Sequence, residues 1–178
     1  VADPPDGCAP LKLDQHAVEG KVVVVQRGAC GFGDKAVHVE QAGGAAMVVT
    51  DPIGIAPHHG PERLCAFNDS MVGDLRRLAD GVRAHDSVLI GQVQDTGRGR
   101  HVPGRTYQAL GASALPDDLS YSMPRAMGVD EIARFIEHTA QSCLRMQACG
   151  FGSIEVSTGH GHLFHQFLFL RSNQRDDA

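Results

Sequence analysis

Three histidines lie close together near the end of the sequence, at His160, His162 and His165. Imidazoles in such a cluster can bind a metal ion, carry a proton or simply pack. A zinc site needs three imidazoles that converge on the metal at about 2.1 Å. In an extended segment His160 and His162 share a face by the two-residue period, whereas His165 does not. We therefore predict no metal site, and both proton chemistry and packing stay open.

Two further motifs could carry chemistry. The turn "RGACGFGDK" has glycines at Gly28, Gly31 and Gly33, a spacing that matches neither the dinucleotide fingerprint nor the phosphate-binding P-loop. We interpret it as a tight turn. His58 and His59 follow a proline in a loop, where a histidine pair is usually solvated.

Strand-like and helix-like segments alternate along the chain, and they must position these residues. This order predicts an α/β fold with a parallel sheet and right-handed crossovers. Chemistry in such folds lies at the carboxyl ends of the strands, here after Thr50, Val93 and Val156. The expected strands are 21–26, 45–50, 87–93 and 153–157; the expected helices are 33–44, 68–85 and 128–150, and a loop spans 94–127.

The two longer helices carry specific expectations. Asp69 or Ser70 is expected to cap the helix of 68–85, because both residue types accept hydrogen bonds from free backbone N–H groups. Apolar spacing also predicts which faces are buried. The expected inner positions are Met71, Leu75, Leu78 and Val82 in that helix, and Ile132, Phe135, Ile136, Thr139, Ala140, Cys143 and Leu144 in the helix of 128–150.

The segment 34–178 resembles the old yellow enzyme-like NADH:flavin oxidoreductases. "QVQDTGR" is similar to the family's third-strand motif Gln-Leu-x-His-x-Gly-Arg, and "GFGSIEVSTGHGHLFHQFL" to its next motif, Gly-Phe-Asp-x-Val-Glu-Ile-His-x-x-His/Asn-Gly-Tyr-Leu followed by Gln-Phe-Leu. "GGAAMVVTDPIGIAPHHG" resembles its second strand. The resemblance implies a TIM barrel holding flavin mononucleotide (FMN), in which NAD(P)H reduces the flavin and the flavin passes a hydride to an activated alkene.

The same resemblance assigns roles to five residues. Gln92 and Arg98 match cofactor-binding positions, Gln92 at the pyrimidine edge of the flavin. Ser157 and His160 match the pair that holds the carbonyl oxygen of the substrate, and His162 matches the tyrosine that donates the proton. Ser157 stands where the family has histidine, His162 where it has tyrosine, and Asp95 where it has the third-strand histidine. We therefore expect impaired activity. A closed barrel needs eight βα units, and the sequence shows four strand signals, so we also expect an incomplete barrel.

The amino-terminal part resembles a protease-associated domain, a non-catalytic interaction module that is commonly extracellular. "DGCAPL" and "GKVVVVQRGACGF" carry the likeness, and Cys8 and Cys30 fall on the two cysteines of that domain. The resemblance implies that these cysteines pair under oxidising conditions. We predict a β-rich protease-associated-like segment at 1–52 and an oxidoreductase segment at 53–178.

Composition limits the partners. The net charge of −5 disfavours nucleic acid, because phosphate neutralisation needs clustered lysine and arginine. No apolar run approaches the roughly 20 residues of a membrane helix. We expect a cytoplasmic oxidoreductase with a small activated alkene as substrate, and self-association through open sheet edges. The alternative is an extracellular interaction module whose barrel-like part serves as scaffold.

Overall fold

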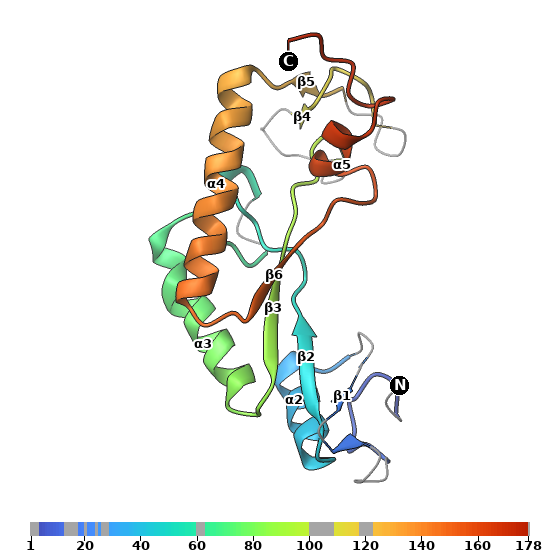
Figure 1. Ribbon diagram of the computed structural model, residues 1–178, viewed down its shortest axis with the longest axis vertical. Helices are drawn as coiled ribbons and strands as arrows, with labels where there is room; N and C mark the ends of the chain where they lie inside the picture. The colour runs from blue at the N-terminus through green and yellow to red at the C-terminus, as the bar shows by residue number, and fades with distance from the viewer. Residues whose placement is uncertain are drawn as a thin grey trace. The chain divides into compact units, whose positions relative to one another are not determined.

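The computed structural model describes residues 4–12, 18–19, 21–23, 25, 29–59, 63–99, 109–117 and 123–177. Strands and helices alternate along this part of the chain as the sequence predicts, except that β3, β4 and β5 follow one another without a helix between them (Figure 1). The strands are β1 (Val22–Val23), β2 (Ala45–Val49), β3 (Val88–Val93), β4 (Leu110–Gly111), β5 (Arg125–Ala126) and β6 (Ser153–Val156). The helices are α2 (Phe32–Gln41), α3 (Val72–Arg83), α4 (Val129–Ala148) and α5 (Leu163–Leu168), with short 3-10 turns η1 (Pro57–His59) and η2 (Asp69–Met71).

The main sheet has the strand order β1-β2-β3-β6. β1 pairs with β2 and β2 with β3 in parallel. The β3–β6 hydrogen bonds run from the Gly152 amide to the Leu89 carbonyl and from the Ser157 amide to the Val93 carbonyl, at 2.9 and 3.0 Å. Residue numbers rise together in both strands, which is the parallel direction. The predicted α/β fold with parallel strands is therefore confirmed.

The chain divides into two compact units, each built from separate stretches of sequence. The first comprises Val1–Asp51, Ser70–Gly91 and Arg145–Ile154, and the second comprises Pro52–Asp69, Gln92–Leu144 and Glu155–Ala178. The predicted junction between 52 and 53 stays a prediction. Among the described residues, no helix combines the length and the apolar character needed to cross a membrane.

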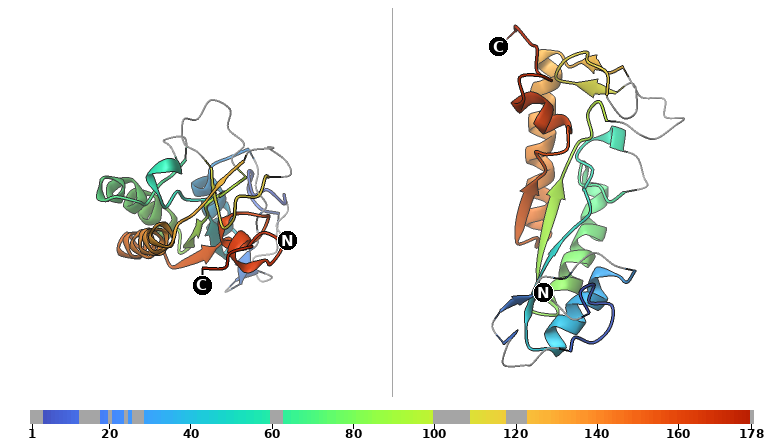
Figure 2. Two further views of the ribbon diagram at one scale, coloured as in Figure 1. Left: turned by 90° about the horizontal axis from the view of Figure 1, so that it is seen from above. Right: turned by 90° about the vertical axis from the view of Figure 1, so that its right-hand side faces the viewer.

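In the first unit α2 lies beside the β1–β2 pair (Figures 1 and 2). Val39 of α2 is fully buried, and Gly44 lets this helix approach the sheet, because an added Cβ would lie 2.7 Å from Val23 and 3.4 Å from Val39. The Cys8–Cys30 disulfide ties the amino-terminal segment to the turn before α2, with the two Cα atoms 5.5 Å apart. The predicted proximity of these cysteines is thus confirmed.

α3 matches the prediction on its buried face but not at its start. Leu75 and Val82 are buried as expected and Ala79 is buried with them, whereas the predicted inner positions Met71 and Leu78 are only half-buried. Asp69 and Ser70 do not cap this helix, because they lie in the 3-10 turn η2 that runs directly into α3. Met71 takes the N-cap position in a helical conformation and makes no side-chain capping bond. The prediction of an Asp69 or Ser70 cap was therefore wrong.

In α4 the buried stripe is rotated from the predicted one. Phe135 is buried as expected, but Ile136 is 62% exposed and Leu144 is 55% exposed. The buried positions are instead Phe135, Ser142 and Met146, which recur at spacings of seven and four residues. Apolar residues lie on two adjacent faces of this helix, and periodicity alone does not tell which of them meets the core.

Gly91 of β3 allows close packing inside the first unit. An added Cβ would lie 2.7 Å from the Met146 sulfur and 3.1 Å from the Phe151 ring, closer than real Cβ atoms tolerate. We expect Gly91→Ala to lower the free energy of unfolding by about 2 kcal/mol, as overpacking of a filled core does. Urea unfolding measures this. Gly81→Ala is the control, because Gly81 of α3 faces open space and its replacement removes backbone freedom, for a gain of about 0.5–1 kcal/mol.

The predicted loop 94–127 contains a small two-stranded parallel sheet, β4–β5. The Arg125 amide donates to the Ala109 carbonyl at 2.9 Å, and the Met127 amide to the Gly111 carbonyl at 3.0 Å. Arg175 clamps this sheet from the far end of the chain, since its Nη1 donates to the carbonyls of Ala112 and Met127.

The start of α4 carries a pH-sensitive contact. Arg125 forms a two-pronged pair with Glu131, at 2.6 and 2.7 Å, and the Gly128 amide also donates to that carboxylate. The hydrogen bonds from Arg125, then from Gly128, hold the pKa of Glu131 at about 2, below the usual 4.5. Because folding lowers the pKa of Glu131, its ionised carboxylate stabilises the fold when the pH is above the unfolded-state pKa. This contribution is lost as the pH falls from about 4.5 toward 2.

We therefore expect Glu131→Gln to remove a small part of the acid dependence of stability, and to do so only in that pH window. The effect is small because the pair is partly exposed and screened by water. Thermal unfolding of the two proteins between pH 2 and 7 measures it. Curves that differ by the same amount at every pH would contradict this prediction.

Candidate functional site

Four polar side chains form two cross-strand pairs at the carboxyl ends of β3 and β6. Gln92 donates from Nε2 to Glu155 Oε1 at 2.6 Å, and Gln94 donates from Nε2 to Ser157 Oγ at 3.4 Å. We call Gln92, Gln94, Glu155 and Ser157 the polar ladder. It occupies the strand ends at which the sequence predicts chemistry.

The alternation of β3 explains why the polar ladder forms. Leu89, Gly91 and Val93 are buried, whereas Ile90 and Gln92 on the opposite side are half-buried. Two residues on along the chain is Gln94, which follows the strand and is buried at 8% exposure. The parallel partner strand presents Glu155 and Ser157 with the same two-residue step. Two predicted site residues, Gln92 and Ser157, are thereby brought to these strand ends.

His160 and His162 follow β6 in a tight reversal. His160 has a φ of 58° and is exposed, and Gly161 has a φ of 73°, so two consecutive left-handed residues turn the chain into α5. His162 occupies the N-cap position of α5, and its ring centroid lies 6.0 Å from that of His160. The structure therefore places the two histidines side by side just beyond the polar ladder.

His165 has a different role. The backbone amide of Gly161 donates to its Nδ1 at 2.9 Å, and its ring lies 5.5 Å from that of Phe169. Because a backbone N–H can only donate, Nδ1 must accept, and the neutral ring carries its proton on Nε2. Among the described residues, no group of three metal-ligating side chains comes together. His165 thus packs within its own turn.

Sequence reasoning missed a hydrogen-bonded pair of ionisable residues, a buried aspartate and a histidine. Asp95, which is 3% exposed, accepts hydrogen bonds from the Gly97 amide and from His58 Nε2, both at 2.7 Å. The expectation that His58 is a solvated loop residue was wrong, because it pairs with a residue 37 positions away and its side chain is 28% exposed. The sequence offered two signals: Asp95 is a carboxylate two residues after a buried strand, and it stands at the histidine position of the third-strand motif. A cavity of about 170 Å³ lies beside the pair, lined by these two residues and by side chains of α4 that include Arg134, Phe135 and His138.

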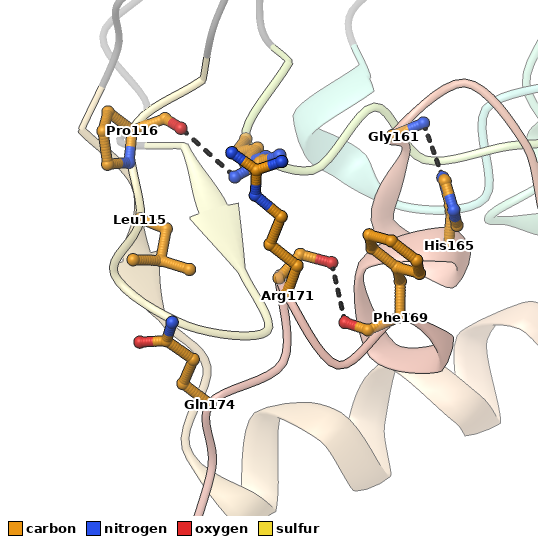
Figure 3. Close-up of a pocket in the computed structure, with 9 residues that line it drawn as sticks. Leu115, Pro116, Gly161, His165, Phe169, Arg171 and Gln174 are labelled. Atoms are coloured by element: carbon orange, nitrogen blue, oxygen red, sulfur yellow. Dashed lines mark hydrogen bonds between the residues drawn. The ribbon is translucent and has the colours of Figure 1, made fainter.

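Arg98 lies in a different environment from Gln92. Its Nη1 donates to the Pro116 carbonyl at 3.2 Å, and it lines a cavity of about 360 Å³ beside α5 (Figure 3). None of the polar-ladder residues is among those that line this cavity. The two predicted cofactor-binding residues therefore do not share this cavity, and both roles stay predictions.

Comparison with known families gives this arrangement a context. Residues 34–178 match the NADH:flavin oxidoreductase / NADH oxidase family. The chain belongs to this family. The match begins within α2 and includes the polar ladder, the histidine turn and α5.

Individual flavin oxidoreductase relatives are similar over the same region. A metal reductase of Desulforamulus reducens is 30% identical over 142 residues, which cover 78% of this chain and 21% of that protein. An NADPH dehydrogenase of Listeria innocua is 30% identical over 138 residues, 76% of this chain and 40% of that protein. An NADH-dependent flavin oxidoreductase of Talaromyces variabilis is 28% identical over 158 residues, 76% and 38% respectively. The matched region is at most two fifths of each of these relatives.

Membership of this family implies FMN and NAD(P)H as cofactors. The polar ladder fits a flavin in its chemistry. The pyrimidine edge of a flavin presents alternating donors and acceptors, and a carboxamide offers one of each. Gln92 is half-buried at the end of β3, and its amide nitrogen donates to Glu155. The role of Gln92 at the edge of the cofactor stays a prediction.

Proposed function

We propose that this chain forms part of an FMN-dependent NAD(P)H oxidoreductase that reduces an activated alkene. Its membership of the flavin oxidoreductase family supports the proposal, and the polar ladder at the ends of β3 and β6 is the observation that carries it. Bound FMN would supply the hydride chemistry. The chain itself supplies residues that hold the flavin edge, hold the substrate oxygen and deliver a proton.

We assign the substrate oxygen to Ser157 and His160. Ser157 Oγ accepts from Gln94, which leaves its own hydrogen to be donated to a carbonyl oxygen. This donor is neutral, so it stabilises developing negative charge less than a protonated histidine would. His162, beside His160 in the same turn, is the proposed proton donor to the alkene carbon, a role that imidazole performs near neutral pH.

Gln92→Ala tests the flavin contact. We expect the dissociation constant for FMN to rise severalfold, because one neutral hydrogen bond contributes about 0.5–1.5 kcal/mol to binding. Quenching of FMN fluorescence during titration with protein measures the constant. The matched control is Gln141→Ala, since Gln141 lies exposed on α4 and its amide donates to Glu137 of the same helix. If the wild type and Gln92→Ala have equal dissociation constants for FMN, Gln92 does not contact the flavin.

We further propose that 53–178 is a part of a TIM barrel and acts in the cytoplasm. β1 and β6 are the outer strands of the four-stranded sheet, and such edges can pair with another chain. We therefore expect the isolated chain to self-associate and to reduce 2-cyclohexenone slowly, well below the ordinary enzyme range of about 1–10³ s⁻¹. Size-exclusion chromatography beside an anaerobic NADPH assay with added FMN tests both points.

A second candidate function is a protein-interaction module of the protease-associated type, in an extracellular setting. The Cys8–Cys30 disulfide favours it, because disulfides persist mainly in oxidising compartments. The β-rich segment 1–52 of this alternative is a proposal. A flavin absorption spectrum in the purified protein would favour the oxidoreductase, and colourless protein that stays colourless with added FMN would favour the module.

A further inference from the structure

The cavity beside α5 has a lining unlike that of the polar ladder. It measures about 360 Å³ and lies within the second unit (Figure 3). One wall is formed by α5 and the segment that follows it, and the opposite wall by the turn at Leu115 and Pro116. Two arginines, Arg98 and Arg171, are among its lining residues, and none of the described residues that line it carries a carboxylate.

The arginines make this cavity attractive for an anion. Figure 3 shows Arg171 extending from the segment after α5 toward Pro116, whose carbonyl receives the hydrogen bond from Arg98 Nη1. That bond holds the Arg98 guanidinium at the wall. A concave surface lined by cations concentrates the positive potential. A guanidinium matches the oxygens of a phosphate by paired hydrogen bonds.

Aromatic surface lies beside the charge. Phe169 is 52% exposed although it is a large apolar ring, and its centroid is 5.5 Å from that of His165. The Gly161 amide fixes the proton of the neutral His165 ring on Nε2, so this ring is a hydrogen-bond donor. Leu115 adds apolar surface opposite. A flat ring can stack on such a wall.

We propose that this cavity binds a nucleotide through its phosphate, with Arg171 as the main phosphate ligand and Phe169 against the base. Arg98 adds positive charge at the opposite wall. Phosphate suits this pair better than a single carboxylate does, because it carries more charge and a third oxygen. The site is separate from the polar ladder, so it does not depend on the flavin contact proposed for Gln92, and it gives Arg98 a ligand other than the predicted FMN.

Isothermal titration calorimetry tests the proposal by measuring the dissociation constant for adenosine 5′-monophosphate. Adenosine, inorganic phosphate and benzoate serve as comparison ligands. We expect the monophosphate to bind most tightly, because only it offers both the ring and the phosphate. Arg171→Ala should weaken it by about ten- to hundredfold, the range for losing a hydrogen bond to a charged group. Arg171→Lys keeps the positive charge but loses the paired guanidinium hydrogen bonds, so its affinity for the monophosphate should lie between those of the wild type and Arg171→Ala.

Two controls separate this site from the rest of the molecule. Arg134→Ala removes an exposed arginine of α4 that does not line the cavity, and Gln92→Ala alters the polar ladder. Both should leave the affinity for the monophosphate unchanged. A change with Gln92→Ala would show that the nucleotide binds at the flavin position, and would overturn the separate site.

Three results would contradict the proposal. If adenosine binds as tightly as its monophosphate, the cavity does not recognise the phosphate. If benzoate binds as tightly, the cavity does not select a nucleotide. If the affinity of Arg171→Glu for the monophosphate equals that of the wild type, Arg171 is not a phosphate ligand. Histidine ¹⁵N spectra give a readout independent of affinity, since the resonances of His165 should show the Nε2-protonated form and should shift on addition of the monophosphate. Absence of that shift at saturation would also count against the site.

Discussion

Asp95→Ala is expected to lower the free energy of unfolding by about 4 kcal/mol. The carboxylate is buried and accepts from two donors, the Gly97 amide and His58 Nε2. Its removal leaves a buried amide without a partner, for about 1–3 kcal/mol, and deletes a hydrogen bond between ionisable groups, for about 1.5–3 kcal/mol. Denaturant unfolding measures the loss.

Two further variants identify the cause. Asp74→Ala removes an exposed carboxylate of α3 that pairs with Arg77 three residues on, and should cost no more than about 1 kcal/mol. Asp95→Asn keeps an oxygen that can accept from Gly97, so it should cost less than alanine. A loss in Asp95→Ala no larger than that in Asp74→Ala would show that the buried pair does not stabilise the fold.

Opening the Cys8–Cys30 disulfide is expected to cost about 3 kcal/mol. The bond closes a loop with a sequence separation of 22, and a cross-link of that span removes this much conformational entropy from the unfolded chain. It also holds the amino-terminal segment against α2, where the Gly7 carbonyl lies 2.8 Å from His38 Nδ1. Unfolding of the oxidised protein and of the double variant Cys8→Ser/Cys30→Ser measures the difference.

The control for the disulfide is Cys143→Ser, which alters a half-buried free thiol of α4 and should cost less than about 1 kcal/mol. Peptide mass spectrometry without reduction checks the pairing directly. Recovery of Cys8 and Cys30 as free thiols from oxidised protein would contradict the structure. Equal stability of the double variant and the oxidised wild type would instead show that the loop is already constrained by other contacts.

The sequence predicted the succession of elements because each one depends on neighbouring residues. The apolar run at 45–50 became β2 and the run at 87–93 became β3, while Gly150, with a φ of 96°, ends α4 as expected. The order of strands and helices, which predicts a parallel sheet, also predicted that chemistry-bearing side chains would lie where the strands end. Gln92 and Ser157 do lie at these strand ends, Gln92 paired with Glu155 and Ser157 with Gln94.

Pairing between distant residues was decided only by the tertiary structure. His58 and Asp95 are 37 positions apart, and each looks ordinary in its own segment. The buried face of α4 was likewise fixed by what packs against it, which is why Ile136 is exposed and Ser142 is buried. The histidine cluster shows the same limit, because Gly161 makes His165 an acceptor whereas His160 stays exposed. Local sequence sets backbone preference, but burial and side-chain partners depend on surfaces that meet only once the chain has folded.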